Sequence, residues 1–593
     1  MKPGYILLSI ALLTGGCKNY LDEEIVSGTS YEYYDTEEGI GKALNAVYAP
    51  LRDFHATENV GTDMNMLGTH IWTDGSTGKV FNEYNATLNS THANLSTLWT
   101  AYYRGINTAN IVIEKTPTVP ASSFLTTTAN RNQWIGEARF MRAFYYFHLV
   151  QQFGRVPLLL TPNLEAKKEF QRASVEAIYR AIISDLRFAS ASLPVAARNY
   201  GRATRGAANH LLAKVYLTRG SAVTDVRGQK PTDMDSAAHF AEAIINSGAY
   251  SLVPDYGKLI EFGNQRNPEV IFAITFNPDV RFGGFDKTGN WTHVVWLWSY
   301  DVVAGMKRDI PNGRPGIRMV LTDYGMNIFD WGKGFRKFDS RFYKNFKWAF
   351  YANNAATIPK WTAANAPNPS LVGKPRFAEG DTAIYLSMDA GVPDAAINRR
   401  PYTWIPRNKF VQGTQKRFPV LLKSLDPTRA DLTIVSSRDW WYARLAETYL
   451  IAAEAHGRMG RYDKAVQYIN KVRERAAYKE GEVKPGQFLT TEGGSRADLT
   501  RSTISQMLIP ADSVNSAAKL VTFMMNERAR ELLGEGHEKY DLLRTELFYD
   551  WVKRYNTQAT GLQPYHKLMP IPQAVHIDRL SDPTNKDHQN EGY

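Results

Sequence analysis

The chain has 593 residues, of which 44% are hydrophobic, 12% aromatic and 22% charged, and its formal net charge is +11. This composition excludes collagen-like, low-complexity and wholly disordered proteins, because so many aromatic residues can form a large core. A single cysteine excludes a disulfide scaffold and multi-cysteine zinc or iron–sulfur sites. The positive excess is either ordinary solvated surface or a preference for acidic ligands. No basic run carries interleaved aromatics, so we expect no nucleic-acid partner.

Residues 1–16 predict a lipoprotein signal peptide. A positive start and a short apolar run from Tyr5 to Leu13 precede small residues and Cys17. The run is too short for a bilayer core, which needs about 20 helical residues. A lone cysteine after small residues resembles a bacterial lipobox, although Thr14 stands where leucine is usual. We therefore expect Cys17 to be acylated, with a plain signal peptide as the alternative, and residues 17–35 to be a linker.

Helical periodicity dominates residues 36–256, which we expect to form the first part of a helical scaffold. Apolar residues recur at three- and four-residue spacing from Gln133 to Phe153, and Gly154 should end that helix. Similar patterns predict helices that start near Thr36, Leu95, Ser174 and Thr204.

Residues 257–437 lose this periodicity and are rich in Gly, Pro, Asn and aromatics. Seven of the 13 tryptophans lie here, at positions 291, 296, 298, 331, 348, 361 and 404. We predict an irregular, loop-rich domain with short strands, inserted in the helical scaffold. Long irregular segments of this kind usually carry function.

Two stretches have the composition of a sugar-binding site, in which flat aromatics stack on sugar rings and polar side chains bind hydroxyls. They are residues 61–84 and 290–301. Trp296 and Trp298 alternate like one face of a strand, which would make a stacking strip. We expect exposed loop aromatics whose loss weakens binding with little effect on stability; the alternative is that they form the core of the irregular domain. The candidate carbohydrate-binding residues are Trp72, Asp74, Tyr84, Trp291, Trp296, Trp298 and Tyr300.

Residues 438–593 predict the second part of the scaffold and a C-terminal tail. Gly460, Tyr462, Ala465, Ile469 and Val472 reproduce the spacing that closes one tetratricopeptide unit. A weaker copy has Ala238, Phe240, Ala241 and Ile245 as its inward face, although any amphipathic helix pair fits it about equally well. The fold class is therefore mostly α, with a tetratricopeptide-like helical repeat scaffold.

Motifs for catalysis and cofactors are lacking. His537 and Glu538 begin an HExxH-like string, but Asp541 takes the place of the second zinc-binding histidine. No phosphate-binding loop, nucleophile elbow or dinucleotide fingerprint is present, so we expect no cofactor, no metal and no catalytic residues. Glu535, His537 and Asp541 instead predict a buried polar network with Arg528 and Arg544. Sequence spacing cannot test for a pair of glycosidase carboxylates.

The chain resembles the SusD/RagB-like outer-membrane nutrient-binding lipoproteins of Bacteroidetes over nearly its whole length. The resemblance rests on residues 17–24 (CKNYLDEE), 136–159 (GEARFMRAFYYFHLVQQFGRVPLL), 444–460 (RLAETYLIAAEAHGRMG), 526–544 (NERARELLGEGHEKYDLLR), 568–577 (LMPIPQAVHI) and 588–593 (HQNEGY).

The resemblance implies about four tetratricopeptide-like helix pairs and an irregular domain laid on them. It further implies a lipid-anchored protein at the cell surface, which covers a SusC-like TonB-dependent transporter in the outer membrane. Such a protein presents bound glycan to the transporter and performs no chemistry. The RagB-like branch implies oligopeptide binding as the alternative, and a secreted glycosidase is a distant third.

Overall fold

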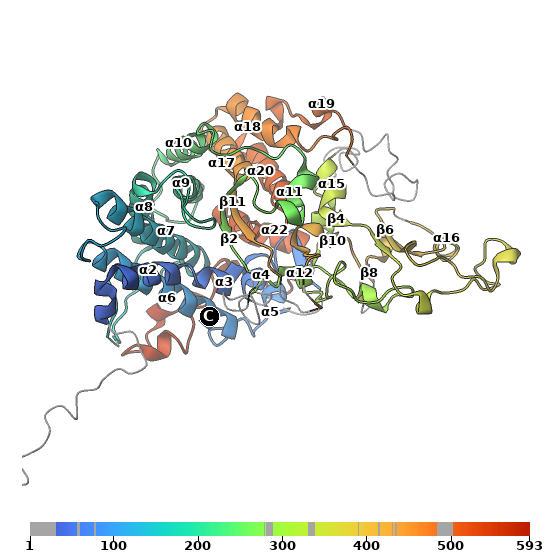
Figure 1. Ribbon diagram of the computed structural model, residues 1–593, viewed down its shortest axis with the longest axis horizontal. Helices are drawn as coiled ribbons and strands as arrows, with labels where there is room; N and C mark the ends of the chain where they lie inside the picture. The colour runs from blue at the N-terminus through green and yellow to red at the C-terminus, as the bar shows by residue number, and fades with distance from the viewer. Residues whose placement is uncertain are drawn as a thin grey trace, which may run out of the picture.

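The computed structural model describes residues 31–55, 60–75, 79–165, 167–277, 279, 289–329, 339–389, 391–412, 415–429, 431–432, 436–482 and 502–593. The predicted signal peptide, Cys17 and Trp331 lie outside these residues. Figure 1 shows an arc of helices and, at the right, an arm that carries β6 and α16 away from the body of the molecule.

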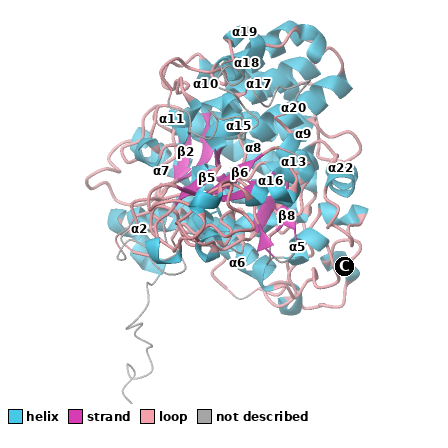
Figure 2. Ribbon diagram, turned by 90° about the vertical axis from the view of Figure 1, so that its right-hand side faces the viewer, coloured by secondary structure: helices cyan, strands magenta, loops and turns pink. Residues whose placement is uncertain are grey.

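Helices are the main regular secondary structure, and the strands are short (Figure 2). The helices are α2 (Glu37–Val47), α3 (Pro50–His55), α4 (Gly61–Asn65), α5 (Lys79–Glu83), α6 (Ala93–Lys115), α7 (Thr128–Phe153), α8 (Val175–Ser192), α9 (Arg205–Gly220), α10 (Asp233–Ile245), α11 (Tyr256–Ile260), α12 (Thr292–Val295), α13 (Asp323–Asn327), α15 (Ser340–Asn345), α16 (Asp394–Asn398), α17 (Leu445–Arg458), α18 (Tyr462–Glu474), α19 (Ile504–Met507), α20 (Ala517–Glu531), α21 (Glu538–Arg544) and α22 (Phe548–Tyr555). Among the described residues, no helix is both long enough and apolar enough to cross a bilayer.

The long helices begin and end where the sequence provides caps. Thr127 precedes α7 and its side chain accepts a hydrogen bond from the backbone N–H of Asn130 at 3.1 Å. Gly154 ends the helix with φ of 67°, a conformation that glycine adopts without strain. Thr36, Ser174 and Thr204 cap α2, α8 and α9 in the same way, so the predicted starts of these helices are confirmed.

The long helices stack in chain order into a continuous scaffold. α6 packs on α7, α7 on α8, α8 on α9 and α9 on α10; α10 then packs on α17, and α17 packs on both α18 and α20. This arrangement confirms the mostly α, tetratricopeptide-like fold class. In α18, Ala465, Ile469 and Val472 are buried as the repeat spacing predicts.

The inward face of α10 differs in part from the prediction. Ala238 and Ala241 are buried, but Phe240 and Ile245 are only partly buried. Ile244 takes the inward place, because it lies three residues after Ala241 on the same helix face.

Residues between α10 and α17 form an insertion built from short strands, short helices and loops. β2 pairs antiparallel with β11 directly before α17, so the insertion leaves and rejoins the scaffold at one two-stranded ribbon. β5, β6 and β7 form a three-stranded sheet, and the other strands pair as β1 with β3, β4 with β10, and β8 with β9. The strands are β1 (Trp72–Asp74), β2 (Val270–Ile274), β3 (Met319–Leu321), β4 (Phe346–Lys347), β5 (Ala349–Tyr351), β6 (Thr382–Ser387), β7 (Thr403–Pro406), β8 (Val411–Gln412), β9 (Gln415–Lys416), β10 (Val420–Leu421) and β11 (Trp440–Arg444).

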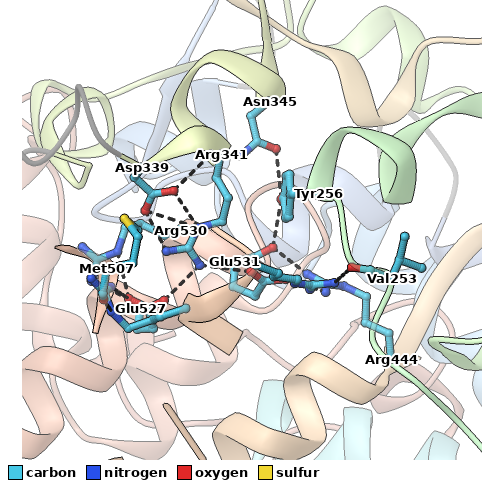
Figure 3. Close-up of polar contacts among 12 residues, drawn as sticks. Val253, Tyr256, Asp339, Arg341, Asn345, Arg444, Met507, Glu527, Arg530 and Glu531 are labelled. Carbon is cyan, nitrogen blue, oxygen red and sulfur yellow. Dashed lines mark hydrogen bonds and ion pairs between the residues drawn. The ribbon is translucent and has the colours of Figure 1, made fainter. Parts of the chain in front are cut away.

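A buried network of ion pairs joins the insertion to the scaffold (Figure 3). Glu531 of α20 accepts hydrogen bonds from Arg341 of α15 at 3.0 Å, from Arg444 of β11 at 2.6 Å, and from Arg475 after α18. The side chains of these four residues are at most 4% exposed. The remaining members are Glu269, Asp339, Lys423, Arg473, Glu527, Arg530 and Glu535.

A second buried cluster confirms the predicted polar network around α21, except for Glu535, which pairs with Lys423 and Arg444 in the first network. Asp541 accepts hydrogen bonds from Arg528 at 2.7 Å and from Arg544 at 2.8 Å. His537 lies beside Lys214 of α9, with Nδ1 and Nζ 3.0 Å apart. The HExxH-like string therefore serves to join helices.

Acid should destabilise the protein through these carboxylates. Burial alone raises the pKa of Glu531, but the charges of Arg475, Arg444 and Arg341 outweigh it and lower the pKa to about 2. The pKa of Glu454, which pairs with Arg544, is also lowered to about 2. Because the folded-state pKa values lie below the unfolded value of about 4.3, this stabilisation is complete above that value and is lost as the pH falls towards 2. Thermal unfolding measured from neutral to acidic pH should show a steep fall in melting temperature below about pH 4.5.

Two matched variants test the contribution of the network to stability. Glu531→Gln removes a buried charge from the network, and Glu474→Gln removes a charge from an exposed pair with Lys471. Removing one partner of a buried pair typically costs about 3–5 kcal/mol, whereas an exposed pair contributes about 0–1 kcal/mol. Glu531→Gln should therefore be much less stable at neutral pH and less sensitive to acid. Equal stabilities of the two variants would contradict a structural role for the network.

Candidate functional site

The two sequence stretches predicted to bind sugar meet in the structure, but they do so in the core. The rings of Trp72 and Trp296 lie 5.6 Å apart, and both residues are 1% exposed. The Trp72 indole also donates a hydrogen bond to Glu538 at 3.0 Å. A side chain enclosed in this way cannot stack on a ligand unless the core opens.

The predicted stacking strip is wrong. Residues 292–295 form the short helix α12, so Trp296 and Trp298 do not alternate along a strand. Trp298 is buried against Phe350, with ring centroids 5.6 Å apart, and Tyr300 stacks on the same phenylalanine at 5.1 Å. These aromatics fill the core of the insertion, which has few long helices to supply apolar side chains.

The other candidates are also mostly enclosed. Tyr84 is buried and donates a hydrogen bond to the carbonyl of Gly68 at 2.7 Å. Asp74 is buried 3.7 Å from the ammonium of Lys416, and burial raises the pKa of its carboxyl. Trp291 is partly exposed. The prediction that the candidate aromatics are exposed is therefore wrong for all of them except Trp291. That the candidate residues bind carbohydrate stays a prediction.

Three other aromatic residues form a partly exposed cluster, which we call the aromatic platform: Tyr324 of α13, with Trp551 and Tyr555 of α22. Tyr324 stacks on Tyr555 with ring centroids 4.0 Å apart and an interplanar angle of 28°. Trp551 packs edge-on against both rings, at 5.9 Å from Tyr324 and 5.8 Å from Tyr555. α13 and α22 are neighbours in Figure 2. Partly exposed flat rings are what a sugar-stacking surface requires.

Local structure fixes the position of the platform. Thr322 caps α13 by accepting a hydrogen bond from Gly325 at 3.0 Å, and its hydroxyl donates to the carbonyl of His70 at 2.6 Å. The buried His70 ring lies 5.6 Å from Tyr324 and 5.2 Å from Trp551. The first predicted stretch therefore supports the platform from beneath, while its own aromatic residues remain in the core.

A groove of about 550 Å³ adjoins the platform. This volume lies within the range of about 300–1,000 Å³ that is usual for small-ligand sites. Tyr324 belongs to its wall and donates a hydrogen bond to Asn526 of α20 at 2.5 Å. The described residues that line the groove are Tyr324, Asn327, Ile328, Ser513, Ala518, Lys519, Thr522, Phe523, Asn526 and Arg530.

A second cavity, of about 680 Å³, lies between the scaffold helices and the C-terminal segment. Its charged side chains are largely paired with one another. Asp225 contacts Arg227 at 2.8 Å and Lys567 at 2.7 Å, and Glu546 binds the backbone of residues 223–225. These charged groups therefore already have partners within the protein.

Within the described part of the chain, no group of three or more His, Cys, Asp or Glu side chains could hold a metal ion.

Sequence reasoning missed the platform. Trp551 and Tyr555 lie four residues apart on α22, while Phe548 and Val552 of the same helix are buried. The signal was weak, because Phe548, Trp551, Val552 and Tyr555 stand at i, i+3, i+4 and i+7 and form one apolar stripe, with the two aromatics at its edge. Tyr324 has no comparable signal, since its place beside α22 depends on the tertiary fold.

Two protein-family profiles match the chain. One, described as starch-binding and associating with the outer membrane, matches residues 19–217, and the profile of the SusD family matches residues 330–592. The SusD-like protein P25 of Formosa agariphila is 24% identical over 623 aligned positions, which cover 99% of this chain and 100% of that protein.

Solved structures show the same fold. A SusD homolog from Bacteroides thetaiotaomicron superposes with a TM-score of 0.63 at 21% identity, covering 96% of this chain and 100% of that chain. A laminarin-binding SusD-like protein superposes with a TM-score of 0.60 at 22% identity, covering 94% of this chain and 100% of that chain. The agreement of both family profiles with these relatives shows that the chain belongs to the SusD/RagB-like family.

Proposed function

We propose that this protein is a lipid-anchored outer-membrane protein that captures glycan at the cell surface and delivers it to a SusC-like TonB-dependent transporter. The family profile described as starch-binding and associating with the outer membrane supports the location and the ligand class. A structural relative with a glycan ligand, the laminarin-binding protein, supports the ligand class further.

The observation that carries the proposal is the aromatic platform beside a groove that also offers polar side chains. The platform supplies partly exposed aromatic rings that can pack against sugars, and Asn526, Asn327 and Thr522 in the groove supply groups that bind hydroxyls. This combination of stacking and hydrogen bonding suits glycan. An oligopeptide favours a cleft with an exposed strand edge, and none of the described residues that line the groove belongs to a strand.

The proposed role is binding without cleavage. Glycosidases usually need a pair of carboxyl groups, about 5–10 Å apart, on either side of the bond that they hydrolyse. The described residues that line the groove include no Asp or Glu. The groove is therefore suited to holding a sugar chain that is passed on intact.

The proposed function makes three predictions, of which acylation of Cys17 is the first. Cys17→Ser should move the protein from the membrane fraction to the soluble exported fraction, because a lipid anchor depends on that thiol. The measurement is fractionation of cells that lack the partner transporter, with carbonate-washed membranes. Retention of the variant on those membranes would show that lipid is not the anchor.

Association with the transporter is the second prediction. A stable complex between a surface protein and a barrel should bury about 2,000 Å² or more. Purification of the tagged protein in detergent, from cells grown on the inducing glycan, should recover a TonB-dependent barrel. Recovery of the tagged protein alone under these conditions would count against the partnership.

Binding at the platform is the third prediction. Tyr324→Ala and Trp551→Ala should each weaken glycan binding about tenfold, or 1.4 kcal/mol, because each removes a stacking ring. Affinity gels that contain laminarin or polygalacturonate provide the measurement, with a melting temperature recorded for each variant. Tyr351→Ala, at a residue that is 51% exposed on β5, is the matched control and should bind normally.

Trp296→Ala distinguishes the platform from the core. Deletion of this buried ring should cost about 3–5 kcal/mol of stability and leave the affinity of the folded fraction unchanged. Normal stability together with lost affinity in this variant would return the site to the residues first predicted from sequence.

A further inference from the structure

The formal charge of the chain is +11, and the groove beside the aromatic platform has the same sign. The charged side chains among its described lining residues are Lys519 and Arg530. Arg530 is buried and donates two hydrogen bonds to Glu527, which it shares with Arg341 and Arg473. Lys519 is the exposed cation among these lining residues.

The ammonium of Lys519 is exposed and contacts neutral oxygens. It donates to the backbone carbonyl of Asp512 at 3.2 Å and to the side-chain oxygen of Asn515 at 2.9 Å. Among the described residues, no carboxylate lies within ion-pair distance of it. Lys519 also stands in the first turn of α20, where the helix dipole disfavours a cation, so helix stability does not explain its position.

A second exposed cation flanks the platform. The guanidinium of Arg554 lies 5.2 Å from the centre of the Tyr555 ring, and it likewise has no ion pair within the described part of the chain. The charge of Arg554 acts on Tyr324 of the platform. Burial raises the pKa of Tyr324 to about 12, while the charges of Arg530 and Arg554 oppose that increase. A ligand stacked on Tyr324 would therefore lie in a positive field.

We propose that the groove takes an anionic glycan, that is, a sugar chain bearing carboxylate or sulfate groups. A sugar ring stacks on the platform, and the anionic groups meet Lys519 on one side and Arg554 on the other. The inference rests on the proposed function and names the ligand class of the same site. Carboxylates and sulfates share the chemistry that these cations recognise, because both present several oxygen acceptors with negative charge.

The test compares charged and neutral polymers. The probes are polygalacturonate for carboxylates, κ-carrageenan for sulfates, and laminarin and agarose as neutral polymers. We expect tighter binding of at least one charged probe than of either neutral one. That preference should shrink as salt rises from about 0.02 M to about 0.5 M, because exposed charges are screened.

Variants that remove a positive charge test whether Lys519 and Arg554 cause the preference for charged probes. Lys519→Gln and Arg554→Gln should each weaken binding of the charged probe about two- to fivefold at low salt, and together about tenfold, without changing the melting temperature. The matched control is Lys471→Gln, which removes an exposed cation on α18 and should leave binding unchanged. Preference for carboxylates over sulfates, or the reverse, identifies the anionic group.

The outcomes separate this inference from the proposed function. Equal affinity for charged and neutral probes, or unchanged binding by Lys519→Gln and Arg554→Gln, overturns the anionic ligand class while glycan capture stands. Charged-probe binding that survives Tyr324→Ala and Trp551→Ala overturns the assignment of the anionic glycan to this groove. Failure to bind any of the four polymers overturns glycan capture, and this inference with it.

Discussion

The buried pairing of acidic and basic residues around α20 is the interaction on which the other parts of the structure depend. Glu527 and Glu531 face inward and are surrounded by guanidinium groups from the insertion and from α18. The outward face of the same helix carries Asn526 and Lys519, which line the groove. The network therefore sets the position of α20, and α20 sets one wall of the groove.

Two further contacts place the platform relative to that wall. β1 pairs with β3, which brings the loop at His70 to the start of α13. Tyr324 then bridges α22, through its stacking on Tyr555, and α20, through its hydrogen bond to Asn526. Segments that are distant in sequence thus meet at one tyrosine, and none of them would form the site alone.

The sequence predicted the scaffold well because its signals are local. Caps such as Thr127 and spacings such as Ala465 to Ile469 determine helix starts and faces within a few residues. The buried cluster around α21 was predictable for the same reason, since Asp541 and Arg544 are neighbours on one helix. Exposure is a tertiary property, so composition alone could not separate buried Trp296 from partly exposed Trp551. The place of Tyr324 in the platform could be found only from the tertiary fold.

The pairing of α10 with α17 has a consequence for how the chain folds. Ile245 ends α10 and Leu445 begins α17, so a loop of about 200 residues must close before these two helices can meet. Until then, the apolar face of α10 that includes Ala241 and Ile244 has no cover from α17 and stays open to aggregation. The closing of this long loop is thus the slow step expected in folding.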